Sequence, residues 1–569
     1  MTSCRYWTLC LERLQQWFSL QRRITSMQHT VAILGGGVAG LSAAHELAER
    51  GFQVHVYERK PVLGGKARSI PVPNSGTNTR ADLPGEHGFR FFPGFYKHVT
   101  DSMRRTPYGA RGNTFDNLTV ATRMLLARAG QTEITCLARY PATLEEFRVF
   151  LLELLTPLGV PLDELTFFVN RLLLVATSCS ERRLKEYENI SWWNFIEAPR
   201  MSDKYRAYLG QGLTRSMVAM RAEESSTRTV GVTQLQLLYG LMSPDRVMDR
   251  LLSGPTNDVW IDPWTRYLEK LGVVFHRGAL VSAIHTSGER VTGIALDSGG
   301  TGSSTIQADF YIAALPVEVM TTLMTDDLKH AAPSLAHLDK LRTRWMNGIQ
   351  FYLSRDEPLV HGHVLYLDSA WALTSISQHQ FWTNVDLSQY GDGTVRGILS
   401  VDISDWETAG TVLRKPAREC TAEQIKEEVW AQLKQHLNDN NAMVIDDANL
   451  VNWFLDPDIE FPNPGSATNA EPLLINTAGS LQYRPEAQVE LENFFVASDY
   501  VRTYTDIACM EAANEAARRA VNCLLLACGS SAPPAQLWPL DEPVFLKPLQ
   551  EIDRISFALG RPQRLGFIH

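Results

Sequence analysis

The feature that most restricts the fold is a glycine-rich turn between an apolar strand and a helix near the start of the chain. Residues 30–34 are apolar or β-branched, and residues 39–50, rich in alanine, leucine and glutamate, are typical of a helix. The turn from Gly35 to Gly40 contains the pattern GxGxxG. Glycines at these places let the backbone approach a pyrophosphate at the positive end of the helix. The pattern predicts a parallel sheet that binds a nucleotide.

An acidic residue completes this nucleotide-binding unit. A second strand at residues 53–57 leads into Glu58, about 20 residues after the glycine turn. A carboxylate at this place accepts hydrogen bonds from a ribose 2′-OH and disfavours a 2′-phosphate. The strand, the helix and the acid together indicate a bound nucleotide, but they leave FAD and NAD both open. The turn residues predicted to contact the nucleotide are Gly35, Gly37, Val38, Ala39 and Gly40.

The residues after Glu58 resemble the extended signature of flavoproteins, in which a pair of glycines follows the ribose acid. Arg59 comes directly after the acid, and Gly64 and Gly65 precede Lys66. The resemblance implies that this loop lies over the pyrophosphate of FAD. It also implies that Lys66 or Arg68 offers positive charge there.

A second motif near the other end of the chain resembles the C-terminal FAD motif of the amine oxidase and carotene desaturase superfamily. A strand at residues 493–497 ends at Ser498 and Asp499, and an alanine-rich helix begins at Met510. The resemblance implies that Asp499 binds the ribityl–pyrophosphate region. It also implies that the first N–H groups of the helix face the pyrimidine edge of the flavin. The family usually has glycine at the place of Ser498, so this chain adds a small side chain near the phosphates.

Two further segments resemble plant- and cyanobacterial-type carotene desaturases and the related hydroxysqualene dehydroxylase-like flavoproteins. Residues 85–96 are similar to the segment beside the flavin ring, and residues 278–284 are similar to the strand that holds adenine by its backbone. The resemblance implies that Gly88 and Val281 bind the cofactor. The candidates near the reactive ring are His87, Arg90 and Tyr96. Each of the three also has a structural interpretation, such as a guanidinium that neutralises a phosphate or caps a helix.

The chain is too long for one ordinary hydrophobic core, with 569 residues. The nucleotide-binding elements occur in three blocks separated by two insertions. We therefore predict an α/β protein in which a Rossmann-like FAD-binding domain is interleaved with an α+β substrate domain. The expected parts are an extension at 1–28, the FAD-binding domain at 29–100, 255–316 and 475–527, the substrate domain at 101–254 and 317–474, and a tail at 528–569.

Composition excludes several other classes of protein. A net charge of -9 argues against nucleic-acid binding, which needs clustered lysine and arginine. The eight cysteines include no CxxC pair and no metal-ligand spacing, so we expect neither a disulfide framework nor a metal site. A reducing cytoplasm fits best. No apolar run is long enough to predict a membrane span.

The first 28 residues have two interpretations. They combine four arginines and one acid with Trp7, Trp17 and Phe18. This composition is typical of an amphipathic segment for targeting or surface binding. The alternative is an upstream extension, with Met27 as the functional start.

The resemblance implies a reaction of non-covalently bound FAD, because no cysteine stands where monoamine oxidases attach flavin. We expect a desaturase or dehydrogenase that passes hydride from an isoprenoid or other lipid-like substrate to flavin N5, with quinone or oxygen as the acceptor. The apolar helical residues 147–176 either line a tunnel and touch a bilayer surface or form plain core. The alternative functions are a flavin amine oxidase, a redox-neutral isomerase, and a prenyl-binding protein similar to Rab escort proteins.

Overall fold

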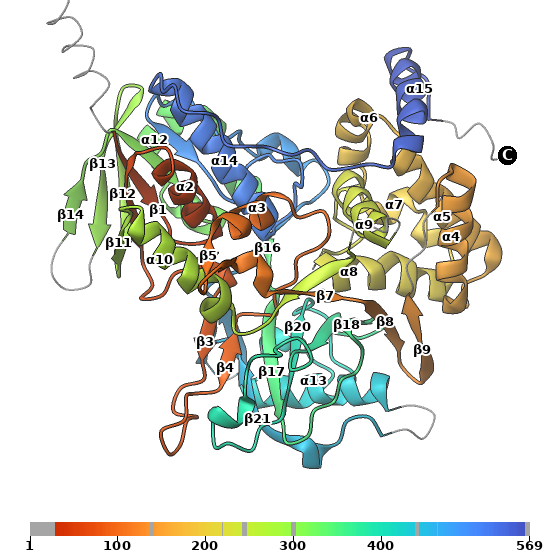
Figure 1. Cartoon of the computed structure of the whole chain (residues 1–569). Helices are drawn as coiled ribbons and strands as arrows, with labels where there is room; N and C mark the ends of the chain where they lie inside the picture. The colour runs from red at the N-terminus through yellow and green to blue at the C-terminus, as the bar shows by residue number, and fades with distance from the viewer. Residues whose placement is uncertain are drawn as a thin grey trace, which may run out of the picture.

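The computed structural model describes most of the chain (Figure 1). The described residues are 29–136, 141–218, 220–241, 247–297, 303–438, 443–463 and 465–563. The predicted N-terminal targeting segment lies outside them.

The nucleotide-binding half is built on a sheet of five parallel strands, in the order β11-β2-β1-β15-β25. The central strand β1 (Thr30–Leu34) pairs with β2 (Gln53–Glu58) on one side and β15 (Phe310–Ala313) on the other. The outer strands are β11 (Val274–Arg277) and β25 (Phe494–Val496). Segments far apart in the chain thus place their carboxyl ends along one edge of the sheet.

Two helices pack against each other on this sheet, and each begins near the carboxyl end of its strand (Figure 1). They are α2 (Val38–Ala48), which follows β1, and α14 (Met510–Ala527), which follows β25. Buried alanines on both helices, including Ala44 and Ala517, let the two backbones come close. Helices α3 (His98–Arg105) and α10 (Asp262–Lys270) contact α14 and α2 respectively, which completes this layer.

The second half is organised by a mixed sheet of seven strands. The strands, in spatial order, are β21 (Leu450–Leu455), β17 (Asn347–Leu353), β20 (Gly397–Ile403), β19 (Leu373–Ser377), β18 (Gly362–Tyr366), β8 (Arg123–Arg128) and β9 (Gln131–Cys136). Only the β18–β8 pairing is parallel among them. Helix α13 (Ala422–Leu437) packs against this sheet through a core of its own.

Smaller strands and helices lie outside these two sheets. The remaining longer elements are β12 (Leu280–Ser287), β13 (Arg290–Asp297), β14 (Ser303–Ile306), β3 (Ser69–Pro71), β4 (Pro84–Glu86), β7 (Leu118–Ala121), β10 (Asp249–Leu252), β16 (Arg342–Arg344), β24 (Leu473–Ile475), α11 (Val317–Thr322) and α12 (Asp326–Ala331). Strand β12 runs antiparallel to β13, and β7 runs antiparallel to β10.

A group of helices forms a separate core at the side of the molecule (Figure 1). The longer members are α4 (Leu144–Leu155), α5 (Leu162–Thr177) and α9 (Thr227–Leu241), joined by the short helices α6 (Ser180–Lys185), α7 (Trp192–Phe195) and α8 (Leu213–Val218). Phe147, Phe168 and Trp192 are fully buried in this cluster. None of the described residues 147–176 lines the main cleft. The plain-core alternative for this segment is therefore the one that the structure supports.

The C-terminal tail ends in helix α15 (Lys547–Ala558), which the sequence did not predict. Asp553 of this helix is buried and accepts hydrogen bonds from Arg182 of α6 at 3.0 Å. This long-range ion pair fixes the tail helix against α6. The sequence around Asp553 does not indicate that Arg182 is its partner. No helix in the described part of the chain is long and apolar enough to cross a membrane.

The predicted fold class is confirmed, whereas the exact domain boundaries remain a prediction. The predicted ends of elements differ by a few residues. For example, the strand expected at 308–315 is shorter, because residues 314–316 leave the sheet to line the cleft. Helix α2 ends at Ala48 because Gly51, with φ of 83°, reverses the chain into β2.

The third glycine of the turn is required for packing. A Cβ on Gly40 would lie 1.9 Å from the carbonyl oxygen of Gly35, whereas a Cβ on Gly37 would lie an ordinary 3.6 Å from Gly65 Cα. We expect Gly40→Ala to lower the free energy of unfolding by about 1–3 kcal/mol, and Gly37→Ala to change it little. Urea unfolding of the flavin-free variants tests this. Equal losses in both variants would contradict it.

Candidate functional site

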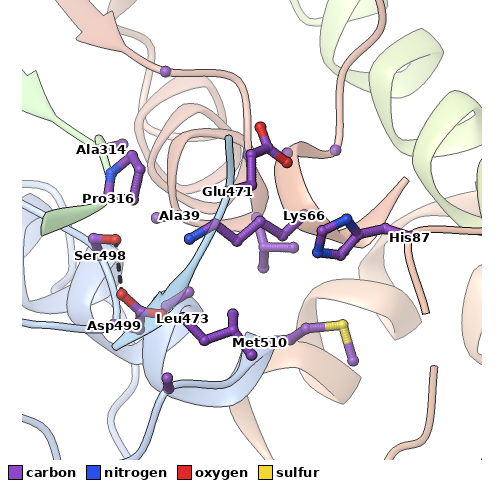
Figure 2. Close-up of a pocket in the computed structure, with 18 of the residues that line it drawn as sticks. Ala39, Lys66, His87, Ala314, Pro316, Glu471, Leu473, Ser498, Asp499 and Met510 are labelled. Carbon is purple, nitrogen blue, oxygen red and sulfur yellow. Dashed lines mark hydrogen bonds between the residues drawn. The ribbon is translucent and has the colours of Figure 1, made fainter. Parts of the chain in front are cut away.

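One cleft collects both halves of the predicted nucleotide site (Figure 2). Its lining includes most residues predicted to bind the cofactor, namely Gly35, Gly37, Val38, Ala39, Glu58, Arg59, Gly64, Gly65, Lys66, Gly88, Val281, Asp499 and Met510. The predicted residue Gly40 does not line it and instead packs against the Gly35 carbonyl. The cleft also contains His87, Arg90 and Tyr96. The roles of all these residues remain predictions.

The two glycine loops meet at the floor of the cleft. The N–H of Gly64 donates to the carbonyl of Gly36 at 2.9 Å, and a Cβ on Gly65 would lie 2.9 Å from the Cα of Gly37. The two backbones can come this close because Gly65 has no side chain. Helix α2 begins after Gly37, which offers no side chain to cap it. Its first N–H groups are therefore suited to phosphate oxygens.

Glu58 holds both loops in place. Its carboxylate accepts the N–H of Gly36 at 2.7 Å and the N–H of Lys60 at 2.8 Å. The side chain is largely buried, as residue Glu58 is 8% exposed. A carboxylate accepts about four hydrogen bonds, so acceptor capacity remains for ribose hydroxyls.

The two cations proposed to face the phosphates behave differently. Arg68 is buried and forms ion pairs with Glu471 at 2.7 Å and with Asp458. This guanidinium is therefore committed to a structural network. Lys66 lines the cleft and pairs with Glu318 of α11 at 2.9 Å. Of the two, only Lys66 is placed to reach a ligand.

The C-terminal motif brings a carboxylate and a helix start to the same cleft. Asp499 accepts a hydrogen bond from the hydroxyl of Ser498 at 3.3 Å, the contact drawn in Figure 2. The start of α14 is fixed by buried Glu511, which accepts the backbone N–H and the ring Nδ1–H of His98 at 2.8 Å. This bond joins the first turns of α14 and α3. Met510, at the start of α14, lines the cleft.

Arg90 binds the loop in which it lies. Its guanidinium donates to the carbonyls of Gly88 at 2.8 Å and Phe89 at 3.1 Å, and also to the carbonyl of Lys66. Burial lowers its pKa, which the charges of nearby acids partly offset. These contacts fit the structural interpretation of Arg90 at least as well as a catalytic one.

Tyr96 lies against the thiol of Cys509, the residue that precedes α14. Burial raises the pKa of Tyr96 well above its ordinary value, and burial also raises the pKa of Cys509 to about 12. Both groups are therefore protonated near neutral pH. A neutral thiol is a poor nucleophile.

His87 projects into the cleft toward Lys66 and Met510 (Figure 2). Its Nδ1 lies 2.7 Å from a carboxylate oxygen of Asp456 and 3.5 Å from one of Asp458. Burial alone would lower the pKa of His87, but these carboxylates raise it. These carboxylates therefore favour the protonated form of the ring.

The carboxylates beside His87 belong to an ion-pair network. The three groups of His87, Asp456 and Asp458 place potential metal-ligand atoms within 4.8 Å of one another. However, Asp458 already pairs with Lys60 at 2.9 Å and with Arg68. Two cations on one carboxylate disfavour a metal ion at this place.

Asp402 lines the cleft and, like Glu318 and Glu471, was not predicted from the sequence. It lies on β20, is buried, and lines the cleft beside Gly88. Burial raises its pKa from 3.8 to about 7, although the charges of Arg90 and His87 oppose the shift. A lone acid in the otherwise fully buried strand 397–403 is the signal that points to it.

Four apolar side chains also line the cleft, and we call them its apolar wall. They were also missed, because single apolar residues carry no motif. They are Phe89, Phe91, Met346 and Leu473.

Comparison with known proteins identifies the family. Residues 38–525 match the family described as flavin containing amine oxidoreductase, and the chain belongs to it. Membership implies a flavin cofactor and places the chain among the flavin-dependent oxidoreductases.

Curated relatives extend this result at low identity. The chain is 24% identical to the 15-cis-phytoene desaturase of Synechococcus elongatus, over 83% of this chain and 90% of that protein. It is 25% identical to the zeta-carotene desaturase of Synechocystis sp., over 52% of this chain and 59% of that protein. The chain thus spans less than two thirds of the length of the latter.

The fold also matches solved structures. The cyclohexylamine oxidase of Brevibacterium oxydans has a TM-score of 0.57 and 12% identity, covering 87% of this chain and 98% of that one. This likeness concerns the fold alone.

Loss of the Asp499 carboxylate should release the cofactor. We expect Asp499→Ala to lose at least half of its bound flavin on desalting, because the ribityl–pyrophosphate region loses its acceptor. The flavin absorbance per protein measures this. The control is Ser498→Gly, which introduces the residue usual in the family and should retain flavin. An unchanged flavin content in Asp499→Ala would refute the two-part site.

The titration of Asp402 should appear in the stability of the protein. The folded state holds this proton more tightly than the unfolded state, so its contribution to stability falls as pH rises from 3.8 to about 7. Asp402→Asn should therefore flatten this part of the wild-type stability curve. Urea unfolding across this pH range gives the comparison. Parallel curves for the two proteins would contradict the assignment.

Proposed function

We propose that the chain is an FAD-dependent desaturase or dehydrogenase that removes two hydrogens from a CH–CH unit of an isoprenoid or other lipid-like substrate. One observation carries the proposal: a single cleft joins the glycine loops and Asp499 to an apolar wall. The first part suits a dinucleotide, and the second suits a hydrocarbon.

The chain's own residues fit FAD. The start of α2 and the loop at Gly64 and Gly65 would hold the pyrophosphate, Glu58 the adenosine ribose, and the backbone at Val281 the adenine. The start of α14 would face the pyrimidine edge. The bound flavin would supply the hydride acceptor, while the protein positions the substrate and excludes water.

Non-covalent binding is also part of the proposal. Among the described residues, Cys509 is the cysteine that lines the cleft. Its thiol contacts Tyr96 and stays protonated, because burial raises its pKa to about 12. A thiol in this state is poorly suited to attack a flavin.

Two observations favour an isoprenoid substrate over an amine. The relatives that act on phytoene and zeta-carotene align with large parts of this chain, whereas the amine oxidase structures support the fold alone. The wall of Phe89, Phe91, Met346 and Leu473 offers apolar contact. Quinone or oxygen as the acceptor, and contact with a membrane surface during substrate uptake, belong to the same proposal.

Anaerobic bleaching of the flavin tests the function. The purified protein is mixed with 15-cis-phytoene, zeta-carotene, an acyl lipid, putrescine and cyclohexylamine in separate experiments. We expect an isoprenoid or the acyl lipid to bleach the flavin absorbance, and the amines to leave it unchanged. Bleaching by amines alone would establish an amine oxidase. Substrate rearrangement without net bleaching would indicate a redox-neutral isomerase. A protein that cannot be reconstituted with FAD would favour the prenyl-binding alternative.

A further inference from the structure

We propose that Asp402 is the proton acceptor of the reaction, the group that removes the second hydrogen of the CH–CH unit. The inference rests on the proposed function and adds a catalytic residue to it. Neither cofactor motif contains Asp402, which comes from β20 of the seven-stranded sheet.

The loop at residues 87–90, which we call the flavin-side loop, leaves room for this carboxylate. A Cβ placed on Gly88 would lie 2.6 Å from Oδ1 of Asp402, which is too close for any side chain. The same Gly88 carries a carbonyl that Arg90 binds, so the loop is fixed where it meets the acid. Glycine at this place lets a carboxylate from the seven-stranded sheet reach the cleft.

One oxygen of Asp402 has no hydrogen-bond donor among the residues that the structure describes. Residue Asp402 is 5% exposed, and within the described ranges its Oδ1 has no hydrogen-bond donor. The backbone N–H of Phe89 does bind the carboxylate. A buried acceptor without a donor loses the hydrogen bonds that it makes to water in the unfolded chain. Such a group indicates a contact that forms when the cleft is filled.

The other acids of the cleft are already engaged. Glu58 accepts two backbone N–H groups, Glu318 pairs with Lys66, and Glu471 pairs with Arg68. Asp499 accepts a hydrogen bond from the Ser498 hydroxyl and comes from the C-terminal motif. Within the described ranges Glu318 also has one oxygen without a donor, but its other oxygen accepts from Lys66. Asp402 differs from these acids in coming from the seven-stranded sheet and in lying against Gly88.

The charges around Asp402 leave it able to gain or lose a proton near neutral pH. Arg90 and His87 face it from the flavin-side loop, and His363 faces it from β18. His363 also pairs with Asp249 at 2.6 Å, and the charge of Glu86 acts on Arg90. These cations favour the carboxylate, whereas burial favours the acid, and the resulting pKa is about 7. A base of this pKa matches the operating pH.

The step balances as a dehydrogenation. One C–H bond breaks and its electron pair leaves as hydride to the flavin. The adjacent C–H bond breaks, its electron pair forms the C=C bond, and its proton goes to the carboxylate of Asp402. The substrate is oxidised by two electrons, and the flavin is reduced by two. The proton then returns to solvent, and quinone or oxygen reoxidises the flavin.

The test compares Asp402→Asn and Asp402→Glu with the wild type in stopped-flow anaerobic reduction by the isoprenoid or lipid that bleaches the flavin. We expect Asp402→Asn to slow reduction by about 10²–10⁴-fold and to lose the pH dependence near 7. Asp402→Glu should recover part of the rate. The matched control is Asp392→Asn, a change of the same kind on an exposed turn, which should reduce at the wild-type rate.

Four further readouts separate catalysis from a structural role. Flavin content, the flavin midpoint potential and the rate of reduction by dithionite should be equal in Asp402→Asn and the wild type. An infrared titration of the holoprotein should show a protonated carboxyl that ionises near pH 7 and is missing from Asp402→Asn. A wild-type rate of substrate-driven reduction in Asp402→Asn would overturn the inference while leaving the function intact. Equal loss of dithionite reduction would also overturn it, in favour of a positioning role. If no isoprenoid or acyl lipid bleaches the wild-type flavin, the proposed function fails, and this inference fails with it.

Discussion

The contact between two glycine loops is the constraint on which the rest of the site depends. The loop before α2 and the loop after β2 touch backbone to backbone at Gly37 and Gly65, where a methyl group added to Gly65 would intrude. Glu58 holds both loops through two hydrogen bonds to main-chain N–H groups. Because the floor of the cleft consists of main chain, it presents N–H groups rather than side chains. That surface is what a pyrophosphate requires.

The strand order then decides which distant segments reach this floor. Strand β25 is an edge strand of the sheet and pairs with β15, which pairs with β1. Asp499 and the start of α14 therefore reach the cleft although they lie near the other end of the chain. Buried Glu511 locks the first turn of α14 to that of α3. The seven-stranded sheet closes the opposite side and brings Asp402 against Gly88. The five-stranded and the seven-stranded sheets thus meet along one loop.

Charge is distributed unequally around the cleft. Arg68, Lys60, Asp458 and Glu471 form a buried network in which the charges neutralise one another. Breaking one partner of such a network leaves an uncompensated charge, so these residues specify the arrangement of the loops. Asp402 is held differently, since burial opposes the charges of its neighbours and keeps its proton exchangeable. The acids of the network, Asp458 and Glu471, are thus surrounded by cations that they pair with, whereas burial dominates at Asp402.

The sequence by itself determined the parts of this protein that depend on local spacing. The glycine turn, Glu58 at the end of the next strand, and the strand–helix motif at Asp499 were predictable, because neighbouring residues alone set their geometry. Only the tertiary structure decided which charges pair. Arg68 forms ion pairs with Asp458 and Glu471, which lie about 400 residues away in the chain, whereas Lys66 lines the cleft. It also decided that residues 147–176 form core and that Asp402 reaches Gly88. Such contacts join segments far apart in the chain, and a local pattern records neither the partner nor the face that will be buried.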